Sequence, residues 1–423
     1  MIPVLGGRGD VTSITASSTR YPCLGTGYVG QTTTEAERTH TARVAATYSR
    51  LTVTVIANDR GASTVGFRKN GANGNQTVSI GASATGVFQD LTNADSVVDG
   101  DEINYVHTTG AGGTTHIATS YAVVARAVRV QTLVHGLARN FAGASTTYAI
   151  PLAGDGGNPT TEADAQLTAR YSGTWAHLYV YVSANARVTT TTLLSRKNAA
   201  DGNQTLSIGA GATGVFEDTS NADSVVDGDV LNVRLATGTG TQTLTTQIIK
   251  TDFVPQGHAV PLCGGSATGL TQNNSLTRYY AVGSDGTNRT TEANAQNRVE
   301  ATGTWSHLAV RLTANGLSAT STLSSRLNGA AGNQSAAIGA SATGYFEDTT
   351  HVDHVVPGSD LNYALVTGAT GSSLRITVFA STFVADSGVS AFREVRERSQ
   401  LARLRRYRPS IPSALALERE RDR

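Results

Sequence analysis

The stretch that decides the fold reads Asn70-Gly71-Ala72-Asn73-Gly74-Asn75-Gln76-Thr77-Val78-Ser79-Ile80-Gly81, followed by Ala84-Thr85-Gly86-Val87-Phe88 and Val97-Val98-Asp99-Gly100-Asp101. The block returns around Gly202-Asn203-Gln204 and again around Gly332-Asn333-Gln334. Asn75 and Asn203 are 128 residues apart, and Asn203 and Asn333 are 130 apart. Solenoids and propellers repeat every ~20–50 residues, so a period of this length indicates whole domains. The sequence therefore predicts three tandem domains.

The domain bounds follow from the repeat. We expect domains at residues 1–128, 129–254 and 255–385, and a chemically distinct, helical or extended Arg-rich tail at 386–423. Each domain is large enough to bury a core without metal or disulfide support. The linkers, around residues 128–130 and 254–257, are too short to act as flexible spacers. The three domains should therefore contact one another.

Composition and periodicity indicate an all-β fold. The chain holds 45 Gly and many Thr residues, and residues 49–56 alternate with Leu51, Val53 and Val55 on one face, as in a half-buried strand. Asn70-Gly71 is suited to a hairpin turn. About eight short strands per domain favour three antiparallel β-sandwich (jelly-roll) domains. The repeated Thr-Thr-Glu-Ala motif at 33–36, 160–163 and 290–293 fits a Thr-capped helical turn or the start of a strand.

The strand at 49–56 has equivalents at 174–182 and 304–312. In these two strands the face opposite the aliphatic one carries aromatic, His and Arg side chains. When aromatic side chains line the face of a strand that points away from the core, another part of the protein, a partner or a ligand normally covers that face. We expect a loop of the same domain, a contact between domains or subunits, or a ligand platform. The interface candidates are Trp175, His177, Tyr179, Trp305, His307 and Arg311.

The repeated acidic turns could suggest calcium, because Asp95, Asp99 and Asp101 lie close together around Gly100. The third copy has Pro357 in place of the middle carboxylate, so turn chemistry explains the motif better than a metal. Nucleophile-elbow, zinc-protease, paired-Cys and phosphate-loop patterns are absent from the sequence. We therefore predict a non-enzymatic protein with no cofactor and no metal, in which Cys23 and Cys263 are unpaired buried residues.

Charge is distributed unevenly. The chain carries a formal charge of +1, whereas residues 391–423 hold ten Arg against five acidic residues. Such a tail could dock on a partner protein, stay disordered in solvent, or bind nucleic acid or a membrane; its interleaved Glu and periodic Leu favour docking. The predicted docking residues are Phe392, Val395, Arg396, Leu401, Leu404, Arg405, Arg406 and Tyr407. No apolar run is long enough to span a membrane, and the first residues do not resemble a secretory signal.

A family resemblance rests on the motifs Arg68-Lys69-Asn70-Gly71, Gly74-Asn75-Gln76, Ala84-Thr85-Gly86-Val87-Phe88-Gln89-Asp90 and Asp99-Gly100-Asp101 with their copies. Residues 1–385 resemble modules of tailed-phage virion proteins, which are similar to jelly rolls of the tumour-necrosis-factor and C1q type. The resemblance implies a structural or adhesive component of the virion surface, commonly trimeric. We expect other virion proteins (capsid, neck or tail) as partners, and a homo-oligomer or a pseudo-threefold arrangement. The alternative is an appendage that binds a receptor or host-surface glycan.

Overall fold

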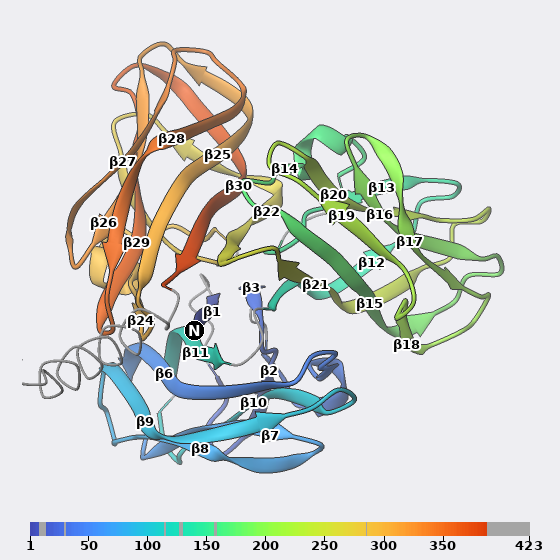
Figure 1. Ribbon diagram of the computed structural model, residues 1–423, viewed down its shortest axis with the longest axis horizontal. Coiled ribbons are helices and arrows are strands. Elements are labelled where there is room, and N and C mark those ends of the chain that lie inside the picture. Colours follow the sequence, from blue (N-terminus) through green and yellow to red (C-terminus); the bar gives the residue numbers. More distant parts are fainter. Residues whose placement is uncertain are drawn as a thin grey trace, which may run out of the picture. The chain divides into compact units, whose positions relative to one another are not determined.

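The computed structural model describes residues 1–7, 14–28, 31–113, 116–126, 130–155, 159–284 and 286–386 (Figure 1). Residues 1–385 form one compact unit. The docking residues predicted in the tail, from Phe392 to Tyr407, lie outside the described residues. Below, modules 1, 2 and 3 denote residues 1–128, 129–254 and 255–385.

Module 2 consists of two facing antiparallel sheets. The first has the order β18 (Gly214–Glu217), β15 (Gly173–Asn185), β21 (Leu244–Pro255) and β12 (Gln131–Phe141), with β19 (Ala222–Val225) also paired to β15. Beyond β12 this sheet continues through a short parallel strand at residues 26–28 into the sheet of module 1. The second has the order β13 (Thr147–Ile150), β20 (Val230–Ala236), β16 (Thr191–Lys197) and β17 (Ala200–Ile208), with β14 (Leu167–Thr168) on β20. The first and last long strands are neighbours, as in a jelly roll.

Modules 1 and 3 repeat this order. In module 3 the sheets are β22 (Ala259–Asn273), β30 (Gly371–Ala385), β25 (Gly303–Leu317), β28 (Gly344–Val355), and β23 (Thr277–Ala281), β29 (Ser359–Val366), β26 (Ser321–Leu327), β27 (Ala330–Ile338), with β24 (Asn297–Val299) on β29. In module 1 they are β1 (Ile2–Gly7), β11 (His116–Arg126), β6 (Ala46–Asn58), β9 (Gly86–Val97), and β4 (Gln31–Thr32), β2 (Thr19–Pro22), β10 (Glu102–Thr108), β7 (Ser63–Lys69), β8 (Ala72–Ile80), with β5 (His40–Thr41) on β10. The fold is all-β, with antiparallel sheets consistent with jelly-roll sandwiches.

The Thr-Thr-Glu-Ala motifs form short 3₁₀ turns: η1 (Glu35–Glu37), η2 (Glu162–Ala165) and η3 (Glu292–Ala295). The helical alternative is therefore the one observed, but the preceding Thr side chains make no cap hydrogen bond. Each first Glu instead accepts two hydrogen bonds from the Arg that opens the repeated block. For Arg196 and Glu162 the donor–acceptor distances are 2.8 and 2.9 Å, and the pairs Arg68–Glu35 and Arg326–Glu292 repeat this geometry. Two motifs more than 30 residues apart thus form one structural unit.

The repeated Gly-Asn-Gln supports a β-bulge in the long central strand. In β15 the bulge lies at His177, which has a positive φ of 56°, and β6 and β25 have the same irregularity at Arg50 and His307. The buried Gln204 accepts a hydrogen bond from the Leu178 N–H at 2.9 Å and donates to the Trp175 carbonyl at 3.0 Å. Gln76 and Gln334 make the equivalent bonds. The glutamine thereby pairs backbone groups that a bulge removes from the ladder.

The bulge also corrects the predicted strand face. Because one residue is inserted at His177, Trp175 lies on the same side as Leu178 and Val180 and is fully buried in the module 2 core. Trp305 lies in the equivalent core of module 3. The prediction that placed both tryptophans on the face of the strand away from the core was wrong, because it assumed uninterrupted alternation.

Candidate functional site: the junctions between the modules

The junction between modules 1 and 2 centres on Arg43. Its guanidinium donates two hydrogen bonds to Glu217 of module 2, at 3.0 and 2.6 Å, and a third to Asp99 of its own module at 3.1 Å. The Glu217 side chain is 6% exposed. Bidentate, charge-assisted geometry of this kind fixes orientation as well as distance.

The junction between modules 2 and 3 repeats the arrangement. Arg170 occupies the position of Arg43, donates two hydrogen bonds to Glu347 of module 3 and donates a third to Asp227 at 3.0 Å. Asp227 occupies the turn position of Asp99, and Glu347 occupies the strand position of Glu217 in the repeated Ala-Thr-Gly block.

The junction between modules 3 and 1 uses the same positions with different charges. Glu300 stands where the other modules have arginine, and it accepts a hydrogen bond from Gln89 of module 1 at 2.8 Å. Gln89 replaces the glutamates at 217 and 347. Arg50 of module 1 adds a longer contact of 3.4 Å to Glu300.

These substitutions are coupled. In modules 1 and 2 the junction residue is Arg, the acidic turn of the same module carries Asp, and the neighbouring module supplies Glu. In module 3 the junction residue is Glu300, the turn carries Pro357, and the neighbouring module supplies Gln89. Asp99 and Asp227 each bind the junction arginine of their own module. An Asp at position 357 would have no such arginine and would instead lie near the carboxylate of Glu300. Module 1 contacts module 2, module 2 contacts module 3, and module 3 contacts module 1. The contacts therefore form a closed cycle of three within one chain.

The first junction also buries an ionic network. The Lys250 ammonium is fully buried and lies 3.1 Å from Asp252 and 3.9 Å from Glu217, and it donates to the Thr41 carbonyl of module 1 at 2.9 Å. Burial opposes ionisation of Asp252, but Lys250 and a hydrogen bond from His177 at 3.1 Å outweigh it and hold the pKa of this carboxyl well below its usual range. Through Lys250, this buried ionic network of module 2 contacts the backbone of module 1.

Apolar contacts accompany each junction. Cys23 of module 1 packs with Val134, Tyr179 and Ile248 of module 2. One core cluster extends from module 2 to Cys263, Ala309 and other residues of module 3, and another joins modules 1 and 3. Burial raises the pKa of the Cys23 thiol to about 12, so this cysteine is an unreactive packing residue.

At three glycines the backbone of one module lies very near the backbone of its neighbour. A Cβ added to Gly27 would overlap the Val134 carbonyl oxygen of module 2, and one added to Gly154 would lie 2.5 Å from the Gly265 carbonyl oxygen of module 3. At Gly283 it would lie 2.6 Å from the Leu5 carbonyl oxygen of module 1. Gly27 also lies in β3 (Thr26–Tyr28), which pairs in parallel with both β1 and β12 and so joins sheets of modules 1 and 2.

The remaining interface candidates lie at or near the junctions. Tyr179 donates from its hydroxyl to the Thr39 carbonyl of module 1 at 3.2 Å, and Arg311 donates to the Gln166 carbonyl of module 2 at 2.9 Å. His177 binds Asp252, and His307 contacts the Ser306 hydroxyl at 3.0 Å. Residues 43, 170 and 300 and their partners were missed in the sequence, although the shared change from Arg to Glu300 and from Asp to Pro357 was visible there.

The acidic turns are occupied by protein hydrogen bonds. Asp95 accepts from the Asn75 and Gln76 N–H groups at 2.6 and 3.1 Å, and Asp101 accepts from the Val98 N–H at 2.9 Å. Within the described residues, no group of three or more His, Cys, Asp or Glu side chains is arranged to hold a metal ion. No helical segment in the described part of the chain is long and apolar enough to cross a bilayer.

Comparison with known proteins adds little. No protein-family profile matches the chain, and no curated protein sequence matches it either. Among solved structures, the chain is similar to one from an archaeal virus described by the words "triple jelly roll fold and turret assembly". The identity is 12% and the TM-score 0.19, over 91% of this chain and 96% of that chain. So low a TM-score carries no inference about this chain.

Proposed function

We propose that this protein is a non-enzymatic structural component of a virion, in which one chain supplies a unit equivalent to a trimer of jelly rolls. It would decorate the capsid or form part of the neck or tail. The observation that carries the proposal is the closed cycle of junctions. The modules that the sequence resembles are commonly trimeric, and in this chain three modules contact one another through Arg43, Arg170 and Glu300.

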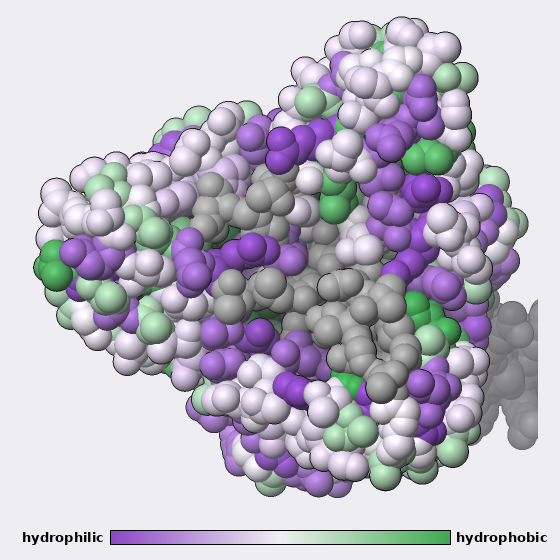
Figure 2. Space-filling model, turned by 180° about the vertical axis from the view of Figure 1, so that it is seen from behind, coloured by the Kyte–Doolittle hydropathy of each residue, from purple (hydrophilic) through white to green (hydrophobic). Residues whose placement is uncertain are grey.

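The exposed surface is compatible with display on a particle. On the face in Figure 2, the described residues are mostly of intermediate hydropathy with hydrophilic patches among them, and strongly apolar residues appear as small spots. Three of the exposed apolar residues, Val98, Val226 and Val356, occupy the same turn in each module. A threefold set of equivalent turns is what a unit placed on a symmetric particle would present.

In this proposal the tail at 386–423 docks the unit on another virion protein, using the arginine and apolar residues named above. Deleting residues 386–423 tests the anchor. We expect the truncated protein to retain its fold, measured by circular dichroism, and to be lost from purified particles, measured by mass spectrometry. Normal incorporation of the truncated protein would refute the anchor. Complete absence of the full-length protein from purified particles would refute the virion role itself.

The second candidate, a receptor- or glycan-binding appendage, loses part of its original support because Trp175 and Trp305 are buried in module cores. Neither tryptophan is available to stack on a sugar. If the protein binds a glycan, other residues must carry the site.

A further inference from the structure

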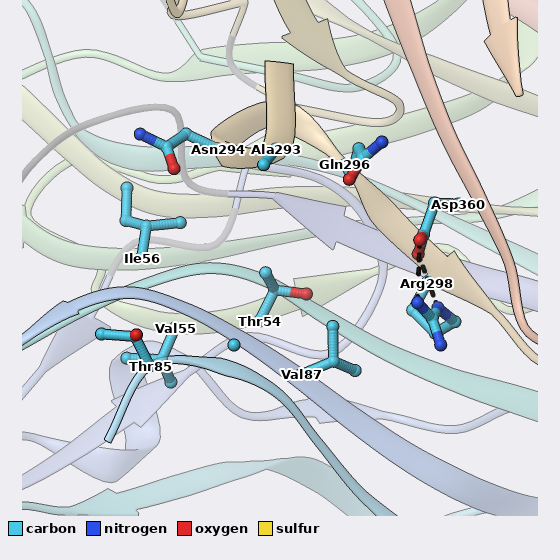
Figure 3. Close-up of a pocket in the computed structure, with 11 residues that line it drawn as sticks. Thr54, Val55, Ile56, Thr85, Val87, Ala293, Asn294, Gln296, Arg298 and Asp360 are labelled. Carbon is cyan, nitrogen blue, oxygen red and sulfur yellow. Dashed lines mark hydrogen bonds and ion pairs between the residues drawn. The ribbon is translucent and has the colours of Figure 1, made fainter. Parts of the chain in front are cut away.

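The junction between modules 3 and 1 contains a cavity of about 300 Å³. Figure 3 shows its two sides: strand residues of module 1 lie below, and η3 with the following residues of module 3 lies above. The cavities beside Arg43 and Arg170 at the other two junctions are about 10 Å³ each. The larger cavity is lined by residues 54–56, 85–87 and 293–298, whereas the two small ones lie at a different part of their junctions.

Two small side chains line the cavity at positions where a larger residue occurs in one or both of the other modules. The strand registers place Thr54 at the position held by Tyr181 in module 2 and Arg311 in module 3. They also place Val87 at the position of Val215 in module 2 and Tyr345 in module 3. In the junction between modules 2 and 3, Arg311 reaches the Gln166 carbonyl and lies over the Tyr345 ring at 5.4 Å. Thr54 and Val87 are too short to fill the corresponding space.

The lining combines hydrogen-bonding groups with a small aliphatic surface. Arg298 donates two hydrogen bonds to Asp360, at 2.5 and 2.8 Å, so the charge in the cavity is balanced. A guanidinium has five N–H donors, and this pair uses two. Side-chain amides and hydroxyls provide further donors and acceptors, while aliphatic groups cover one side; these residues are Asn294, Gln296, Thr54, Thr85, Val55, Ile56 and Val87.

We propose that this cavity binds one neutral sugar residue of a surface polysaccharide. The hydroxyl groups of a neutral sugar can hydrogen-bond to the guanidinium, amide and hydroxyl groups of the cavity without adding a net charge. The C–H groups of the sugar ring can pack on the Val and Ile side chains. The volume lies at the lower end of small-molecule pockets, about 300–1,000 Å³, which suits a single ring rather than a long chain segment. The proposal does not depend on the virion role.

The test uses saturation-transfer NMR on the full chain with glucose, galactose, mannose, N-acetylglucosamine and N-acetylgalactosamine as probes. We expect at least one sugar to bind the natural protein. Two variants fill the cavity with the residues found at other junctions: Val87→Tyr, at a side chain that is 38% exposed, and Thr54→Tyr. Each should weaken binding at least tenfold.

The matched control is Val188→Tyr, which adds the same phenol at a 65% exposed position outside the cavity and should leave binding unchanged. Because Val87 is partly exposed, its replacement keeps the test informative if Thr54→Tyr fails to fold. Binding of none of the five sugars to the natural protein, or equal binding by Val87→Tyr, would overturn the proposal.

Discussion

Replacing Gln204 by Leu tests the explanation of the repeated Gly-Asn-Gln block. The side chain is fully buried and binds the Leu178 N–H at 2.9 Å, the Trp175 carbonyl at 3.0 Å and the Asp223 carboxylate at 3.0 Å. Leucine has a similar volume but leaves both backbone groups of the bulge unpaired. At about 1–3 kcal/mol for each buried unsatisfied group, we expect a loss of about 2–6 kcal/mol in the free energy of unfolding.

Urea denaturation measures this loss through tryptophan fluorescence, since Trp175 reports on module 2 and Trp305 on module 3. The neighbouring exposed Thr205 supplies the control: Thr205→Val should change stability by no more than about 0.5 kcal/mol. Gln334→Leu should reproduce the loss in module 3. If Gln204→Leu is as stable as Thr205→Val, the glutamine does not support the bulge.

Three further predictions concern the junctions and the acidic turns. Arg170→Glu places a carboxylate against Glu347 and Asp227 and should lower the free energy of unfolding by several kcal/mol. The double variant Arg170→Glu with Glu347→Arg should recover more than half of this lost stability, as measured by urea denaturation in a double-mutant cycle. If the effects of the two substitutions simply add, the two residues are not paired at the junction. Lys250→Met should cost about 3–5 kcal/mol because it leaves Asp252 buried without its ammonium partner, and differential scanning calorimetry showing an unchanged Tm would refute this. Burial opposes ionisation of Asp218, but hydrogen bonds from Asn221, Thr205 and Ser220 outweigh it and lower the pKa of this carboxyl from 3.8 to about 2. The ionised Asp218 therefore stabilises the fold above pH 3.8, and this stabilisation is lost as the pH falls towards 2. Acid titration followed by circular dichroism should show a shallower loss of structure for Asp218→Asn than for the natural protein.

Much of the fold follows from local sequence. Alternation in residues 49–56 and turn residues such as Asn70-Gly71 indicate strands and hairpins because side chains and φ angles act locally. The expected all-β class agrees with the antiparallel sheets observed. The predicted tail residues, such as Phe392 and Tyr407, remain predictions.

The junctions were harder to predict because they depend on contacts between distant residues. The bulge at His177 shifts Trp175 to the core face, and alternation alone cannot reveal an inserted residue. Arg43 and Glu217 are 174 positions apart, and no local rule pairs them. The linked differences at Glu300, Pro357 and Gln89 have a physical reason only in the folded chain, where Gln89 of module 1 donates a hydrogen bond to Glu300 of module 3.

Closure of the three modules within one chain is the central claim, and cross-linking across the third junction tests it most directly. Gln89→Cys and Glu300→Cys place thiols at residues whose side chains are hydrogen-bonded at 2.8 Å, whereas the native Cys23 and Cys263 are buried. Treatment of the purified double variant with a short bismaleimide should give an internally linked species with the mass of one chain. Each single variant should give no such species. Cross-linking of the double variant mainly between two chains, or a failure to link at all, would contradict the closed cycle.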